Sequence, residues 1–159
     1  AVQIGIGTRR TKNISKAVLG HTGGRGYEAI REFKTNNSLQ FAIGSKIGAD
    51  IFSVGDIVRV SGLTKGKGFA GVVKRHGFHG GPRTHGQKHS EREAGSIGGG
   101  GGRAGGRVAK GIRMAGRLGN ERVTVMNLKV LVVDPKDGEI IVSGAVPGRR
   151  GTLLEVVSQ

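Results

Sequence analysis

The histidines and a glycine-rich segment in the middle of the chain are the residues whose types and spacing could do chemistry. His76, His79, His85 and His89 have spacings found in metal sites. Gly66–Gly71 (GKGFAG) has the G-x-G-x-x-G spacing of nucleotide-binding loops. A metal site also recruits carboxylates or thiolates and fixed partners, and a nucleotide loop needs a strand before it and a helix after it. The surroundings of these residues therefore decide what they can do.

Those surroundings argue against a catalytic or metal site. The chain has no Cys, and the histidines lie among Lys and Arg, whose charge repels a cation. The sequence after Gly71, VVKRHGFHGGPRTHG, predicts at most two helical turns, too few for a nucleotide-binding fold. Ser90 beside His89 and Glu91 lies in a polar loop without a further nucleophile–base pattern. We therefore expect no catalytic residue, no metal and no cofactor, and a nucleotide-dependent enzyme using Gly66–Gly71 is only a third hypothesis.

Positive charge is the dominant property of the chain. Its 159 residues include 26 Lys and Arg against 11 Asp and Glu, which gives a net charge of +15 and a pI near 11.3. A field of this size attracts polyanions, so nucleic acid is the expected partner. No apolar run approaches the roughly 18 residues of a membrane-spanning helix. The chain opens without Met, which indicates a fragment or a processed chain.

Charge and glycine divide the chain into three stretches. Residues 62–119 contain 12 Lys and Arg, 2 acidic residues and 19 of the 32 glycines. Their seven branched apolar residues cannot bury enough area to offset the ordering of the backbone. We therefore expect residues 62–119 to form a basic extension rather than an independent globule. Residues 1–61 and 120–159 are expected to form one discontinuous β-domain.

The flanking stretches predict a mainly β fold, in the form of a small barrel. Apolar residues alternate or run together in segments typical of strands. A turn at Asp134–Gly138 predicts a hairpin, and Pro147-Gly148 predicts a second turn. Ser15 could cap a short helix that ends at Gly20. The predicted strands are 2–6, 57–61, 123–133, 140–143 and 152–157, and the predicted helix is 16–19.

Two of the predicted strands are apolar on both faces, which is typical of a barrel or a covered sheet. They span 128–133 and 140–143. From this pattern we expect Val130 and Val132 to lie in the core.

The extension carries the candidate RNA-binding residues. Basic residues recur at three- or four-residue steps from Arg103 to Arg117, and residues 94–120 contain no acid, whereas a solvated surface mixes charges of both signs. The run Gly98–Gly102 taken alone would suit a flexible linker. Glycines such as Gly68 let a bare backbone approach a polyanion closely. The candidates are Lys65, Lys67, Gly68, Lys74, Arg75, His76, Arg83, His85, Lys88, Arg92, Arg103, Arg107, Lys110, Arg113 and Arg117.

Several blocks of the chain together resemble a known family. In order, they are KGKGFAG at 65–71, VKRH at 73–76, GGP at 80–82, THG at 84–86, GSIG at 95–98, MAG at 114–116, GNERVTV at 119–125 and GAVPG at 144–148. These blocks closely resemble the bacterial large-subunit ribosomal protein three family, and residues 1–60 are compatible with it.

The resemblance implies a non-enzymatic structural protein of the large ribosomal subunit. It implies a translation-protein β-barrel with an extension that threads into large-subunit rRNA toward the peptidyl-transferase centre. It also implies binding near the 3′ end of that rRNA, a role in early assembly, and contacts with large-subunit proteins fourteen and nineteen. The location implied is the ribosome in the cytoplasm of a bacterium, or in an organelle of bacterial descent. The alternative is a free-standing basic protein that coats nucleic acid without a fixed site.

Two departures from the family pattern bear on these expectations. Bacterial members usually begin with a strand pair that precedes the first residue of this chain, so we expect an unpaired barrel edge here. Many members also carry a methylated Gln just after the GSIG block, where this chain has Gly99–Gly102. That modification is therefore not expected at the usual place.

Overall fold

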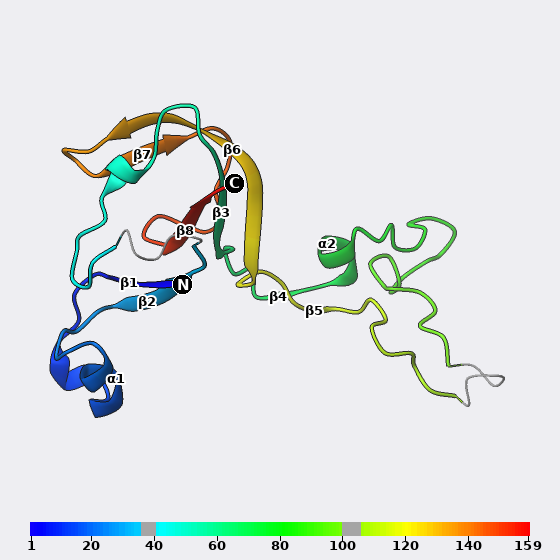
Figure 1. Ribbon diagram of the computed structural model, residues 1–159. Coiled ribbons are helices and arrows are strands. Elements are labelled where there is room, and N and C mark those ends of the chain that lie inside the picture. Colours follow the sequence, from blue (N-terminus) through cyan, green and yellow to red (C-terminus); the bar gives the residue numbers. More distant parts are fainter. Residues whose placement is uncertain (36–40, 100–105) are drawn as a thin grey trace. The chain divides into compact units, whose positions relative to one another are not determined.

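The computed structural model describes residues 1–35, 41–99 and 106–159. The chain divides into two compact units, residues 1–47 and 48–159, and each is described by itself (Figure 1). The described strands are all antiparallel and form three sheets, which confirms the predicted mainly β class. No helix in the described ranges is both long and apolar enough to cross a membrane.

The first unit is built on a strand pair. Strand β1 (Val2–Ile6) was predicted, and it pairs with β2 (Ala29–Phe33). The sequence did not predict β2, because adjacent charged residues interrupt the alternation in AIREF. Tyr27 packs on this pair, with its ring 2.7 Å from the position that a Cβ on Gly5 would occupy.

The helix of the first unit begins where it was predicted and ends later. Helix α1 spans Lys16–His21, and the Ser15 hydroxyl accepts a hydrogen bond from the Val18 amide at 3.4 Å, which confirms the predicted cap. The predicted stop at Gly20 was wrong. A helix commonly ends where a residue adopts left-handed backbone, and that occurs at Gly23 (φ 62°) and Gly24 (φ 81°).

The second unit contains a four-stranded sheet. Its strands are β3 (Ile57–Leu63), β6 (Arg122–Asp134), β7 (Glu139–Val142) and β8 (Leu154–Ser158), in the order β7-β6-β3-β8. All four correspond to predicted strands. The predicted hairpin is also present, because the Asp134 carboxylate accepts the amide of Lys136 at 2.9 Å and Gly138 is left-handed (φ 69°).

The predicted barrel is not closed within the residues that the structure describes. A barrel requires its first and last strands to pair, and β7 and β8 are instead opposite edges of an open sheet. The core of the sheet is small. Val58, Val60, Leu128 and Val130 are buried, and Phe52, Val125, Val133, Ile140, Val142, Leu154 and Val156 pack around them.

Two irregularities in β6 decide which side chains reach this core. Val58 pairs with Leu128 but Val60 pairs with Val125, so β6 has one extra residue there, next to left-handed Asn127 (φ 59°). A second extra residue, Leu131, follows Val130, because Val130 pairs with Val142 while Val132 pairs with Ile141. The prediction that Val132 lies in the core was therefore wrong: its side chain is 47% exposed.

Val130 and Val132 provide a matched pair of stability variants. Val130→Ala should lower the free energy of unfolding by about 1–3 kcal/mol, because it removes buried methyl groups and leaves a void. Val132→Ala should change it by no more than about 0.5 kcal/mol, as expected for a surface position. Urea unfolding followed by circular dichroism measures both. Equal losses in the two variants would contradict the outward orientation of Val132.

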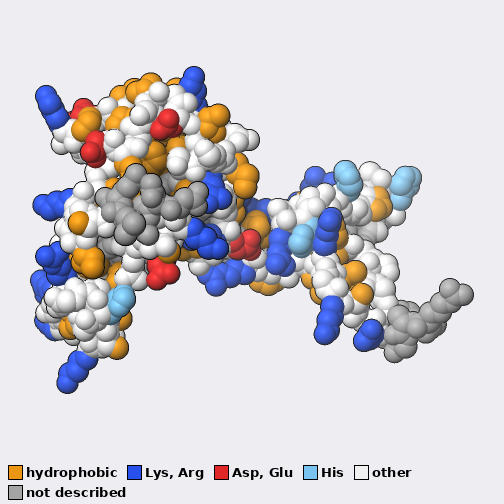
Figure 2. All heavy atoms as spheres, in the orientation of Figure 1, with side chains coloured by type: hydrophobic (Ala, Val, Ile, Leu, Met, Phe, Trp, Pro, Cys, Tyr) orange, Lys and Arg blue, Asp and Glu red, His pale blue; other side chains and the backbone are white. Residues whose placement is uncertain are grey.

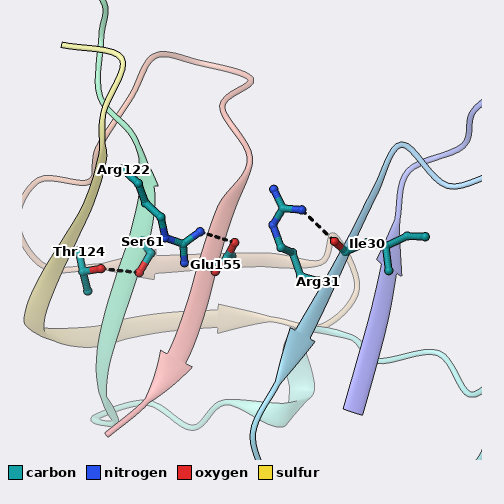
Figure 3. A network of polar contacts seen from close by, with 6 residues as sticks. All are labelled: Ile30, Arg31, Ser61, Arg122, Thr124 and Glu155. Carbon is teal, nitrogen blue, oxygen red and sulfur yellow. Dashed lines mark hydrogen bonds and ion pairs between the residues drawn. The ribbon is translucent and has the colours of Figure 1, made fainter. Parts of the chain in front are cut away.

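A polar network crosses one face of this sheet where β6 begins (Figure 3). Arg122 donates to both carboxylate oxygens of Glu155, and the Ser61 and Thr124 hydroxyls share a hydrogen bond of 2.7 Å. The hydrogen bond and the charge of Glu155 raise the pKa of Arg122 above its ordinary value. Because β3 lies between β6 and β8, the ion pair bridges two strands that are not hydrogen-bonded to each other.

Candidate nucleic-acid interface

The chain leaves the four-stranded sheet after β3 and returns to it before β6 along a two-stranded ribbon. We use this name for residues 64–71 and 116–121. The Thr64 amide donates to the Glu121 carbonyl (2.9 Å), and the amides of Lys67 and Leu118 donate across the ribbon at 2.9 Å. The ribbon ends in the short pair of β4 (Phe69–Ala70) and β5 (Gly116–Arg117). It therefore brings together four of the predicted residues, Lys65, Lys67, Gly68 and Arg117.

The ribbon also explains why Gly66–Gly71 is not a nucleotide loop. A phosphate-binding loop needs backbone amides that point at the ligand. Here the Lys67 amide is bonded to the Leu118 carbonyl, and the Gly68 carbonyl accepts from Leu118. The helix that follows, α2 (Val72–His76), has only five residues. The loop is thus part of a hydrogen-bonded ribbon.

The glycines of the ribbon have different structural requirements. Gly119 is left-handed (φ 76°), and a Cβ on it would lie 2.1 Å from the Lys65 carbonyl oxygen. Gly68 is also left-handed (φ 65°) but has open space around it. A Cβ on Gly71 would meet no atom within 4 Å, and one on Gly66 would meet only Asn120, at 3.8 Å. Gly119 is therefore required by the ribbon itself, whereas Gly66 and Gly71 are not.

Helix α2 holds the outgoing and returning chains together beyond the ribbon. The Arg75 guanidinium and the His76 ring both donate to the Met114 carbonyl, at 2.8 and 3.0 Å. Val72 is 5% exposed, and Lys74 is exposed. Two of the predicted RNA-binding residues, Arg75 and His76, thus also have a structural contact that the sequence did not predict. No local pattern could have revealed it, because Met114 is 38 residues away from His76 in the sequence.

Beyond α2 the described residues form irregular loops. The Gly81 amide donates to the Glu91 carbonyl (3.1 Å), and a Cβ on Gly80 would strike the same oxygen, so two chain segments approach closely here. Arg83 lies 3.6 Å from the Glu91 carboxylate. A hollow of about 670 Å³ is lined by His76, Phe78, His79, Ser90, Glu93 and Arg113, together with neighbouring glycines and an alanine.

Most of the predicted RNA-binding side chains are exposed. Figure 2 shows Lys and Arg side chains along the extension (residues 62–119), which leaves the four-stranded sheet. Arg75 and His76 are partly buried by their contact with Met114. Arg103 lies outside the described residues, as do Gly100–Gly102 of the glycine run. The exposed candidates are Lys65, Lys67, Gly68, Lys74, Arg83, His85, Lys88, Arg92, Arg107, Lys110, Arg113 and Arg117.

The electrostatics of the extension favour a polyanion. Its two carboxylates, Glu91 and Glu93, both lie in the loop beyond α2, so the ribbon contains only Glu121 as an acid, next to the sheet. Across residues 1–35, 41–99 and 106–159, no three His, Cys, Asp or Glu side chains are grouped so that they could hold a metal ion. Cations held on hydrogen-bonded backbone can bind successive phosphates of a nucleic acid.

Comparisons with known proteins identify the family. The family described as Ribosomal protein L3 matches residues 29–146. The protein named large ribosomal subunit protein uL3 from Herpetosiphon aurantiacus is 47% identical over 158 residues, which cover 98% of this chain and 74% of the relative. The protein of the same name from Cutibacterium acnes is 48% identical over 161 residues, covering 99% and 71%. The chain therefore belongs to the ribosomal protein L3 family.

Proposed function

We propose that this chain is a non-enzymatic, structural constituent of the large ribosomal subunit that binds rRNA mainly through residues 62–119. The observation that carries the proposal is the ribbon, which holds Lys65, Lys67 and Arg117 exposed on a hydrogen-bonded support. The relatives' name, large ribosomal subunit protein, supports the same assignment. Ribosomes of a bacterial cytoplasm are the proposed location, since the relatives are bacterial.

The finer parts of the proposal rest on the family resemblance. We infer that the chain binds near the 3′ end of the large-subunit rRNA, acts early in assembly and extends residues 62–119 toward the peptidyl-transferase centre. Large-subunit proteins fourteen and nineteen are the proposed protein neighbours. The RNA-binding residues of the proposal are the exposed candidates of the extension, with Arg75 and His76 stabilising the support.

Sedimentation tests this function against a free-standing protein that coats nucleic acid. A tagged copy of the chain is expressed in bacteria, and the lysate is separated on a sucrose gradient after a high-salt wash. A structural constituent stays with the large subunit, because many simultaneous contacts hold it. A coating protein would be released by the wash or distributed over all nucleic acid, and that result would refute the proposal.

A glycine variant separates backbone approach from charge at this interface. Gly71→Val should be excluded from large subunits more strongly than Lys67→Ala, although it removes no charge. A Cβ on Gly71 meets no atom within 4 Å in the isolated protein and the backbone is allowed (φ −69°), so we expect the exclusion to come from RNA packed against this position. Gly68 is a poorer probe, because its left-handed backbone strains any valine.

The measurement is the ratio of variant to wild-type protein in large subunits from cells that express both. Gly20→Val is the matched control, because a Cβ there also meets no atom within 4 Å but lies in α1. Normal incorporation of Gly71→Val together with exclusion of Lys67→Ala would mean that charge alone governs this segment.

A further inference from the structure

Phe69 is exposed to solvent, although folding usually buries aromatic side chains. Its side chain is 80% exposed, whereas the other four phenylalanines of the sequence are partly buried. The next residue, Ala70, is 4% exposed. The ribbon therefore buries a methyl group and leaves an aromatic ring in solvent at adjacent positions. Burying the ring instead would have stabilised the fold more, because the free energy gained by burial increases with the apolar area removed from water.

The register of the ribbon fixes this orientation. Phe69 pairs with Arg117, and Ala70 pairs with Gly116. On the Ala70 side, the Arg75 guanidinium lies 2.6 Å from where a Cβ on Gly116 would be, so α2 covers that side. A shift by one residue would exchange the two faces. The bonds that join Leu118 to Lys67 and Gly68, both 2.9 Å long, hold the register that turns Phe69 outward.

The residue opposite Phe69 is a cation suited to nucleic acid. Directly paired residues of antiparallel strands have Cβ atoms about 4.5–5.5 Å apart on the same face, so the Arg117 side chain starts beside the ring. A guanidinium group binds phosphate and also stacks on flat π systems. Residues 94–120 contain no acid, and Lys65 and Lys67 precede Phe69 in the same half of the ribbon. A neutral apolar protein surface would match the ring but leave these positive charges unpaired, whereas RNA offers both a flat base and a phosphate.

We propose that Phe69 and Arg117 form a stacking platform for one unpaired nucleobase of RNA. The ring supplies the stacking surface, and Arg117 binds the adjoining phosphate or extends the stack. A base within a duplex has both faces covered, so the platform requires an unpaired or unstacked nucleotide. Stacking accepts all four bases, because each has a π face. The inference rests on the proposed function and names the part of RNA that one segment of the interface contacts.

Substitutions of Phe69 in the full chain test the platform. The probe is an in vitro transcript of bacterial large-subunit rRNA, and the dissociation constant is measured by filter binding at fixed salt. Phe69→Ala should weaken binding about 5- to 150-fold, the range expected for one lost base stack. Phe69→Leu should lose most of the same affinity, and Phe69→Tyr should keep affinity within about threefold, because only the tyrosine retains a π face. Val108→Ala, which truncates another exposed apolar residue of the extension, should bind as the wild type does.

A melting temperature for each variant accompanies these measurements. It should stay unchanged, because Phe69 contributes little to the core. Equal affinity of Phe69→Leu and Phe69→Tyr would overturn stacking. Normal rRNA affinity with loss from assembled subunits would also overturn it and indicate a protein contact. If the wild type binds the transcript tightly and the Phe69 variants bind it equally well, the platform is wrong and the proposed function stands. If the wild type itself does not bind the transcript, the proposed function fails.

Discussion

Gly119→Ala is expected to open the ribbon and to reduce rRNA affinity at least tenfold. The added Cβ would lie 2.1 Å from the Lys65 carbonyl oxygen and 3.1 Å from the Gly66 Cα, and neither backbone atom can rotate away. The left-handed backbone of Gly119 (φ 76°) adds strain of about 1–3 kcal/mol. Separation of the two chains would remove the bonds that orient Lys67 and Arg117, so their charges would no longer be held in a fixed arrangement.

Two other glycines make this result interpretable. Gly66→Ala lies in the same ribbon but meets only the Asn120 side chain, at 3.8 Å, so it controls for mutation of the ribbon. Gly138→Ala has a similar left-handed backbone (φ 69°) with no atom within 4 Å, so it measures the strain without the clash. The readouts are amide exchange of Lys67 and Leu118 and the dissociation constant for the rRNA transcript. Protected amides in Gly119→Ala would show that the ribbon tolerates the clash.

The affinity for rRNA is expected to depend steeply on salt. If about eight of the basic residues of the extension neutralise phosphates, the logarithm of the binding constant should fall against that of the salt concentration with a slope of roughly −6 to −7. A tenfold rise in salt would then weaken binding about a millionfold, the largest effect predicted for this protein. A slope flatter than about −2 would mean that the extension is not the main contact.

Paired charge removals locate the source of that slope. Lys65→Ala together with Lys67→Ala should make the slope less negative by about 1.4–1.8, because each residue contributes one phosphate contact. Lys136→Ala removes one positive charge from the exposed turn between β6 and β7 and should leave the slope unchanged. An equal change per charge removed at the two places would indicate a response to net charge rather than to contacts of the ribbon.

The sequence predicted elements whose signal is local. The alternation in Val2–Ile6 and the turn residues of Asp134–Gly138 identify strands and a hairpin, because pleat and turn chemistry act within a few residues. The basic character of residues 62–119 was equally visible, since charge needs no folding to be counted. The predicted division into a discontinuous β-domain and an extension stays a prediction.

Features that depend on long-range pairing could not be predicted. Val130 and Val132 look alike in the sequence, and only the extra residue Leu131 in β6 sends one inward and the other outward. The contact of His76 with Met114 joins segments far apart in the chain. Phe69 was part of the recognised KGKGFAG block, yet its exposure follows from a register set by the returning strand.

The central position of β3 has a consequence for the order of events during synthesis. Leu63 of β3 pairs with Arg122 of β6, and Val58 pairs with Ser158 of β8, so its two partners leave the ribosome about 59 and 100 residues later. The extension (residues 62–119) thus emerges before β6 and β8, the strands that pair with β3. Pairing over such separations is slow to nucleate.

The cost of closing the loop, however, rises by only about 0.6 kcal/mol for each doubling of loop length. The length of the extension between β3 and β6 can therefore change over evolution while the four-stranded sheet keeps nearly the same stability.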